Sequence, residues 1–136
     1  MSTLLLDASV ILAAFDRDDA LHKPARAILS EAAVTLATLD LARYEVTNVA
    51  IRAWRAPKQV APLLDAIERI ASDGGVLLST NTLLARAAQI ADEHTLSAYD
   101  AAYVAAAAQA GGTLVSCDVR DLVGKGLADS PATALR

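Results

Sequence analysis

The chain has 136 residues, of which 54% are hydrophobic and 21% are charged, and its formal net charge at pH 7 is −4. A chain of this length builds one domain with a core of its own, and its apolar content excludes intrinsic disorder. The single cysteine, Cys117, excludes an intrachain disulfide framework. The acidic balance argues against non-specific coating of nucleic acid, but it is compatible with a nucleic-acid enzyme whose carboxylates bind divalent cations.

The hydrophobic residues do not form a membrane segment. The longest apolar run, 101–108, is about half the length that a membrane-spanning helix needs. The N-terminal stretch has no basic residue and reaches an acid at Asp7, which is not typical of a signal peptide. We therefore expect a single soluble domain over residues 1–136, in the cytoplasm and away from membranes.

Short aliphatic runs alternate with helical patterns of ten or more residues. This alternation is typical of βαβ units and predicts an α/β fold with a parallel sheet. The tail after Gly126 is expected to add either an edge strand or no element. In chain order, the pattern predicts strands over 3–6, 35–39, 76–78 and 113–117, helices over 8–15, 20–33, 41–54, 57–72, 83–93 and 97–110, and a short helix after 118.

Acidic residues follow three of the predicted strands. Asp7, Asp40 and Asp118 stand where these strands end, and functional groups gather at the carboxyl ends of parallel strands. Glu45 and Asp100 lie early in predicted helices. Each acid also fits a structural role: the first three as helix N-caps, Asp100 in a capping box and Glu45 as a first-turn acid.

Taken as a set, these acids are better explained by chemistry. Asp100 has only Ala and Tyr around it on a helix without other charges, and Asp7 lies between two aliphatic runs. A buried carboxylate needs a cation or a metal as partner, and no Lys or Arg is close in sequence to either residue. Carboxylates without a Cys or His set suit Mg²⁺ or Mn²⁺ rather than zinc. The pattern indicates metal-dependent hydrolysis of phosphodiester bonds.

Four stretches of the chain, 5–12, 44–49, 96–103 and 114–118, resemble the motifs of PIN-domain ribonucleases, in particular VapC-type toxins, in order and in spacing. The resemblance implies a three-layer α/β/α fold with a central parallel sheet of four to five strands. It also implies an acidic site that cuts RNA with Mg²⁺, for which Mn²⁺ can substitute. A cognate antitoxin that covers the site and a toxin homodimer are further implications of the resemblance.

The resemblance also assigns roles residue by residue. It makes Asp7, Glu45, Asp100 and Asp118 the catalytic acids, and it makes all of these except Glu45 metal ligands. Ser9 matches a small hydroxyl residue that orients the first carboxylate or a metal-bound water.

Three further residues are compared with the family pattern. Asp121 matches an additional, supporting acid that some members carry near the last motif. Asp40 has no catalytic counterpart, so we interpret it as a helix cap. Cys117 stands where small polar residues are more common, and a cysteine packs as a small hydrophobe without changing the role of the following acid.

A basic stretch allows three interpretations. It carries Arg52, Trp54, Arg55 and Lys58. These residues could contact RNA phosphates and stack a base, or they could bind the antitoxin. Alternatively, the stretch is a helix C-terminus whose cations meet the helix dipole while the tryptophan packs.

The other residues that we considered receive structural roles. Arg17, Lys23 and Arg26 are expected on the solvated surface, and Tyr99 and Tyr103, four residues apart on one helix, are expected to pack.

The chain lacks the residues that rival phosphoryl-transfer folds require. Only Asp7 follows the first strand, which excludes the paired acids of a response-regulator receiver. Ser9 stands where a haloacid-dehalogenase-like phosphatase needs a second Asp, and no glycine-rich turn follows the strand. The remaining alternative is a catalytically weak or inactive PIN-like binding module, against which the intact set of four acids argues.

Overall fold

Four parallel strands form the centre of the molecule. The computed structural model describes residues 2–136. The strands are β1 (Ser2–Leu6), β2 (Val34–Leu39), β3 (Gly75–Leu77) and β4 (Thr113–Val115). The principal helices are α1 (Ala8–Ala13), α2 (His22–Ser30), α3 (Leu41–Asn48), α4 (Val60–Ala71), α5 (Asn81–His94) and α6 (Ala98–Gln109).

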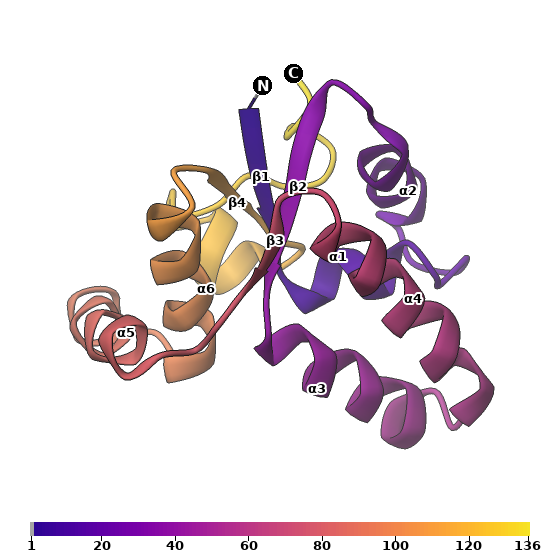
Figure 1. Ribbon diagram of the computed structural model, residues 1–136, viewed down its shortest axis with the longest axis horizontal. Helices are drawn as coiled ribbons and strands as arrows, with labels where there is room; N and C mark the ends of the chain where they lie inside the picture. Colours follow the sequence, from indigo (N-terminus) through magenta and orange to yellow (C-terminus); the bar gives the residue numbers. More distant parts are fainter. Residues whose placement is uncertain (1) are drawn as a thin grey trace.

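The helices cover both faces of the sheet. The strand order is β3-β2-β1-β4, and Figure 1 shows α5 and α6 on one side of the sheet and α1 to α4 on the other. The predicted three-layer α/β/α fold with a parallel sheet of four strands is therefore confirmed. No helix within residues 2–136 is long and apolar enough to cross a bilayer.

Strand β1 lies in the middle of the sheet. Leu5 pairs with Ala37 of β2 on one side and with Leu114 of β4 on the other, and it is fully buried. A strand covered on both faces needs apolar side chains throughout, which is why it appears in the sequence as a continuous aliphatic run. The alanine-rich α6 is also buried, as its composition predicts, because small side chains let a helix approach its neighbours closely.

Because all four strands run in one direction, their carboxyl ends meet at one edge of the sheet. Asp7 follows β1 there, and its backbone N–H donates to the carbonyl of Val115 at the end of β4 (3.2 Å). Asp40 follows β2, and its N–H donates to the carbonyl of Leu77 at the end of β3 (2.9 Å). This edge collects the acids that follow the strands.

Several predicted elements end earlier than the sequence pattern indicates, and two of them show the physical reason. The helix expected over 41–54 leaves α-helical geometry after α3 and continues as a π-helical turn, η1 (Val49–Ala53), in which the N–H of Trp54 donates to the carbonyl of Val49 (2.9 Å). Strand β4 stops at Val115 because the N–H of Ser116 donates to Asp129 of the C-terminal tail instead (3.0 Å). The tail forms only an isolated bridge, not the edge strand that was one of the two expectations.

Two short helical turns complete the chain. One is a 3₁₀ turn, η2 (Pro57–Gln59), which leads directly into α4. The other is a π-helical turn, η3 (Val119–Val123), which is the short helix predicted after 118. Turns of π type are frequent at functional sites, and η3 begins immediately after Asp118.

Candidate active site

Asp7 is the most deeply buried acid of the site, with 6% of its surface exposed. Its Oδ1 accepts hydrogen bonds from the N–H of Ser9 (3.0 Å), from the Ser9 hydroxyl and from the N–H of Val10 (3.3 Å). Asp7 therefore caps α1, so the structural role weighed for it is real. Burial raises the pKa of Asp7 to about 6, hydrogen bonds from Ser116, Ser9 and Val10 oppose this, and the charge of Glu45 adds to it.

Two serines connect the ends of β1 and β4. The Ser9 hydroxyl, which donates to Asp7, also accepts a hydrogen bond from the N–H of Cys117 (2.9 Å). Ser116 is fully buried, its Oγ accepts from the N–H of Asp118 (3.0 Å), and its side chain lowers the pKa of Asp7. Ser116 is not among the site residues predicted from the sequence. Its position at a strand end, two residues before an acid, is a weak signal, and its burial is visible only in the structure.

Glu45 is held by a tyrosine from the opposite layer. The hydroxyl of Tyr103 on α6 donates to Glu45 Oε1 on α3 (2.7 Å), and only 2% of the Tyr103 surface is exposed. Burial raises the pKa of Glu45, the Tyr103 hydrogen bond lowers it, and the charge of Asp100 raises it. Burial and the neighbouring Glu45 also raise the pKa of Tyr103.

The structure corrects two predictions about Glu45 and the tyrosines of α6. Glu45 is the fifth residue of α3 and not a first-turn acid. The packing role expected for the tyrosines is incomplete for Tyr103, which also makes this polar contact, and wrong for Tyr99, which is 63% exposed. The difference follows from position along α6, whose buried residues all lie between Ala101 and Ala107.

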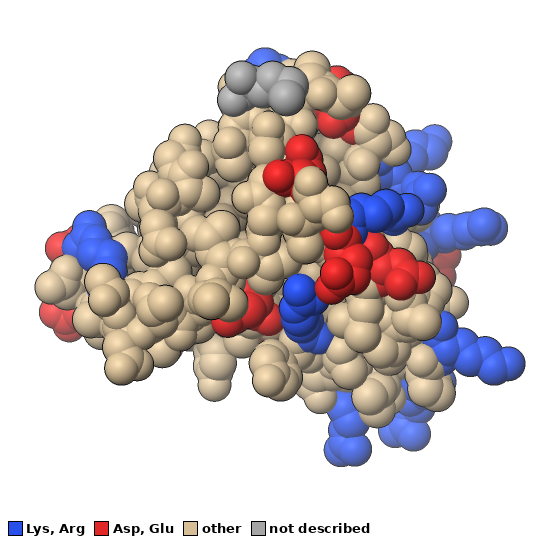
Figure 2. All heavy atoms as spheres, in the orientation of Figure 1, with Lys and Arg blue, Asp and Glu red and all other residues tan. Residues whose placement is uncertain are grey.

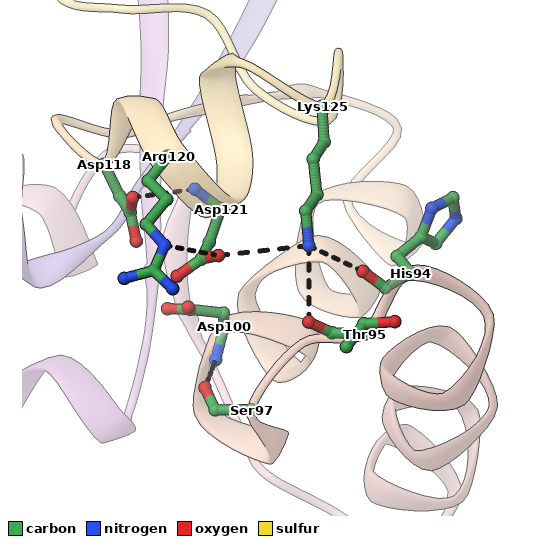
Figure 3. Close-up of polar contacts among 8 residues, drawn as sticks. All are labelled: His94, Thr95, Ser97, Asp100, Asp118, Arg120, Asp121 and Lys125. Carbon is green, nitrogen blue, oxygen red and sulfur yellow. Dashed lines mark hydrogen bonds and ion pairs between the residues drawn. The ribbon is translucent and has the colours of Figure 1, made fainter.

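Three carboxylates converge beside the end of β4. One oxygen from each of Asp100, Asp118 and Asp121 lies within 4.8 Å of the others. Figure 3 shows Asp118 and Asp121 on the turn after β4 and Asp100 below them on α6. Backbone hydrogen bonds fix the local geometry: Asp118 Oδ1 accepts from the N–H of Asp121 (3.0 Å), and Ser97 Oγ accepts from the N–H of Asp100 (3.1 Å).

The three carboxylates carry more negative charge than the nearby cations offset. Lys125 Nζ lies 3.9 Å from Asp121 Oδ1, but it also donates to the carbonyls of His94 (2.7 Å) and Thr95 (3.3 Å). Arg120 Nε is 4.0 Å from the same oxygen of Asp121, and the Arg120 side chain is 93% exposed. The pKa of Asp100 is raised, first by burial and then by the charges of its two acidic neighbours, while Ser97 and Lys125 lower it.

This donor set fits a hard divalent cation. Three carboxylates, without a histidine or cysteine in the cluster found within residues 2–136, supply oxygen ligands of the kind that Mg²⁺ and Mn²⁺ prefer. Asp7 and Glu45 lie outside this triad but adjoin it, because Glu45 perturbs Asp7 and Asp100 perturbs Glu45. We call these two acids and the triad together the acidic cluster. Which of them bind a metal stays a prediction.

The sequence model of the PIN domain matches residues 4–122 of the chain. The chain belongs to the PIN-domain family. Comparison with curated proteins gives no match. The fold of this PIN domain is nevertheless shared with proteins of known structure.

Three solved structures illustrate the likeness. VapC20 of Mycobacterium tuberculosis, described as a sarcin-ricin loop cleaving toxin, superposes with a TM-score of 0.71 at 24% identity, covering 90% of this chain and 95% of that one. PAE2754 from Pyrobaculum aerophilum gives 0.68 at 27% identity, covering 98% and 87%. A toxin–antitoxin complex from Klebsiella pneumoniae gives 0.69 at 17% identity, covering 94% and 97%. The chain therefore spans nearly the whole length of these structures.

Asp40, the remaining strand-end acid of the PIN domain, has a structural role different from the predicted one. It makes no capping hydrogen bond to α3, because its own backbone is already helical (φ −56, ψ −27). Its carboxylate instead accepts from the N–H of Ser79 (2.9 Å) and from the Ser79 hydroxyl. The interpretation of Asp40 as a helix cap is wrong: it ties the end of β2 to the segment after β3.

The basic stretch lies on the rim of the molecule. Trp54 is half-buried and packs against the hydrophobic core, as the structural interpretation expects. Arg52, Arg55 and Lys58 are exposed, and Arg55 has a left-handed backbone (φ 51) that ends the π-helical turn. RNA contact and partner contact by these cations stay predictions.

Proposed function

We propose that this PIN domain is a metal-dependent endoribonuclease and the toxin of a VapC-type toxin–antitoxin pair. The convergence of three carboxylates next to Asp7 and Glu45, at the carboxyl edge of a parallel sheet, is the observation that carries the proposal. A cluster of acids that raise one another's pKa costs stability, so a purely structural domain has no use for it. The description of VapC20 as a toxin that cleaves the sarcin-ricin loop supports RNA as the substrate.

The acids divide into metal ligands and a base. Asp100 and Asp118 would hold Mg²⁺, or Mn²⁺ in its place, together with Asp7 from the end of β1 and with Asp121 as a supporting ligand. The bound ion would polarise the scissile phosphate and make the attacking water more acidic.

The other residues of the chain orient these groups. Ser9 and Ser116 hold the carboxylate of Asp7 in place. Tyr103 occupies Glu45 Oε1, and the second oxygen, Oε2, accepts no hydrogen bond from the described residues. We assign Glu45 Oε2 as the general base that takes a proton from the attacking water. Its raised pKa brings it closer to neutrality, where a base is most effective.

The proposed partners are an antitoxin and a second copy of the chain. The similarity to a toxin–antitoxin complex supports the first. A cognate antitoxin has to block the acidic cluster or the access of RNA to it, so it should suppress cleavage in the assay described next.

The decisive experiment is cleavage of total RNA by the purified chain in Mg²⁺ or Mn²⁺, compared with EDTA. Asp100→Asn should abolish cleavage. The matched control is Asp65→Asn, which removes an exposed carboxylate of α4 that makes no side-chain hydrogen bond to the described residues, and it should cleave as the wild type does. Equal cleavage by both variants would contradict the proposal. Absence of cleavage together with absence of metal binding would favour a PIN-like binding module.

A further inference from the structure

A groove on the surface of the domain is lined by basic side chains. It has a volume of about 630 Å³ and runs between the α1–α2 loop, the start of α2 and η2, where Arg17, His22, Arg26 and Gln59 line it. Arg17 also lines an adjoining hollow of about 350 Å³, whose other wall includes Trp54. We call the larger depression the basic groove, and the hollow with Trp54 adjoins its end.

The cations of this region have no acidic partners. Among residues 2–136, neither Arg17 nor Arg26 lies within 4.0 Å of a carboxylate. The same holds for Lys23 and for the exposed cations of the basic stretch. Figure 2 shows lysine and arginine side chains along the edge of the molecule formed by α2, the start of α4 and the end of α3. Six of the twelve cations of a chain with net charge −4 thus belong to two segments, the α1–α2 loop with α2 and the stretch from η1 to η2, which favours an anionic ligand there.

The groove is anchored at the C-terminal end of α1. Arg26 Nη1 donates to the carbonyl of Ala14 (3.3 Å), and His22 Nδ1 lies 2.8 Å from the carbonyl of Ala13. These contacts hold the two side chains in place before any ligand arrives, so less conformational freedom is lost on binding. Arg26 is exposed, as predicted for the solvated surface, and its side chain also bridges α2 and the end of α1.

The nearby acids do not cancel this charge. Asp16 and Asp18 belong to the adjoining hollow, and Asp16 Oδ1 accepts the N–H of Asp18 (3.0 Å) within the loop. The groove proper, with Arg17 and Arg26, has no carboxylate in its lining. The charged side chains that line the groove are therefore the two arginines, whereas carboxylates line the acidic cluster.

We propose that the basic groove binds the phosphates of single-stranded RNA on one side of the bond that the acidic cluster cuts. The inference rests on the proposed function for the identity of the ligand. The acidic cluster repels a polyanion, so the affinity for RNA has to come from another part of the surface. Arginine side chains bind phosphate through paired N–H groups, and an aromatic ring at the groove's end offers a stacking surface for a base, which an acidic peptide would not use.

The position of the groove fits this role. Asp7 caps the N-terminus of α1 and the groove lies at its C-terminus, which separates them by about 9 Å along a helix of six residues. The loop between α1 and α2 begins at this end of the helix and forms one wall of the groove with Phe15 and Arg17. A strand that leaves the acidic cluster along this loop meets the groove within a few nucleotides.

The single tryptophan of the chain makes the proposal testable. Titration with a short single-stranded RNA in EDTA should change the fluorescence of Trp54, because this side chain lines the hollow that adjoins the end of the groove. The double variant Arg17→Gln/Arg26→Gln should raise the Kd about tenfold and should flatten the slope of log K against log salt by about 1.4, as expected for two lost phosphate contacts. In Mg²⁺ the KM for cleavage should rise while kcat stays close to that of the wild type.

A matched control separates the groove from general electrostatics. Arg86→Gln/Arg136→Gln removes the same charge from exposed residues of α5 and the C-terminal tail, and its Kd should stay within about twofold of the wild type. Because Arg26 supports Ala14, Arg17→Gln alone is the second test: Arg17 donates no hydrogen bond within residues 2–136, so its loss leaves the fold intact. An equal loss of affinity in the control would overturn the proposal.

Other outcomes are equally decisive. Binding of labelled RNA without a change in Trp54 fluorescence would mean that RNA binds elsewhere, and it would contradict the proposed role of the groove. Displacement of RNA from the groove by an oligoglutamate peptide as readily as by unlabelled RNA assigns it to an acidic protein partner instead. RNA binding that changes Trp54 fluorescence without any cleavage in Mg²⁺ supports the groove but contradicts the proposed function. Cleavage with an unchanged KM in the Arg17→Gln variant supports the proposed function but contradicts RNA binding by the groove.

Discussion

Asp7→Asn should make the metal-free protein more stable at neutral pH and should change its stability little in acid. Burial raises the pKa of Asp7 from 3.8 to about 6. Between these values the folded protein holds a proton that the unfolded chain has released, so the free energy of unfolding falls as the pH rises through this window. Above about pH 6 both states are ionised and the loss is complete.

The magnitude follows from the size of the pKa change. One pKa unit corresponds to 1.36 kcal/mol, so ionisation of buried Asp7 destabilises the folded state by about 3 kcal/mol above pH 6. Asparagine has no charge to bury, and its side-chain oxygen can still accept from the N–H groups of Ser9 and Val10, so the cap of α1 is kept. The expected gain is therefore up to about 3 kcal/mol at neutral pH and close to zero near pH 4.

Urea denaturation in EDTA from about pH 4 to pH 8 measures this effect. The wild type should lose stability between pH 4 and 6, whereas Asp7→Asn should lose much less. The control Asp65→Asn, an exposed carboxylate, should follow the wild type. Parallel curves for wild type and Asp7→Asn, or a less stable variant at neutral pH, would refute the reasoning. Mg²⁺ should stabilise the wild type more than Asp7→Asn, because the ion binds the folded state and partly neutralises the repulsion.

Three further variants test other parts of the site. Tyr103→Phe removes the hydroxyl that lowers the pKa of Glu45. The acidic limb of the pH–rate profile should therefore move to higher pH, and kcat should fall about tenfold. An unchanged profile would argue against Glu45 as the base. Lys125→Met removes a cation 3.9 Å from Asp121. Because this cation repels a metal ion, calorimetry should show Mg²⁺ binding about two- to fivefold tighter in the variant. Weaker Mg²⁺ binding would mean that the lysine mainly positions Asp121. Asp40→Ala should lower the free energy of unfolding by about 1–3 kcal/mol, because the hydrogen bonds to Ser79 are lost. Cleavage per folded molecule should be unchanged. Loss of activity in a folded variant would place Asp40 in the site.

Much of the fold was predictable because local patterns decide it. Aliphatic runs such as that of β1 are continuous since both faces of the strand are covered, and the acids follow strands whose carboxyl ends must meet in a parallel sheet. Asp7 and Asp118 could therefore be selected from their positions at strand ends, although the same rule also selected Asp40. Asp100 stood out because its neighbours on the helix carry no charge. The limits of helices were less predictable, because the π-helical turn after α3 depends on hydrogen bonds such as that from Trp54 to Val49 rather than on composition.

The sequence by itself determined which acids are available and at which edge of the sheet they lie. Only the tertiary structure decided their partners, because these come from residues far apart in the chain. Tyr103 reaches Glu45 across 58 positions, and Asp40 bonds Ser79 across 39. Sequence patterns record periodicity and neighbours within a few residues, whereas a hydrogen bond between layers depends on how helices pack on the sheet. The same reason explains why Arg26, a surface cation in the sequence, is a wall of the basic groove in the folded protein.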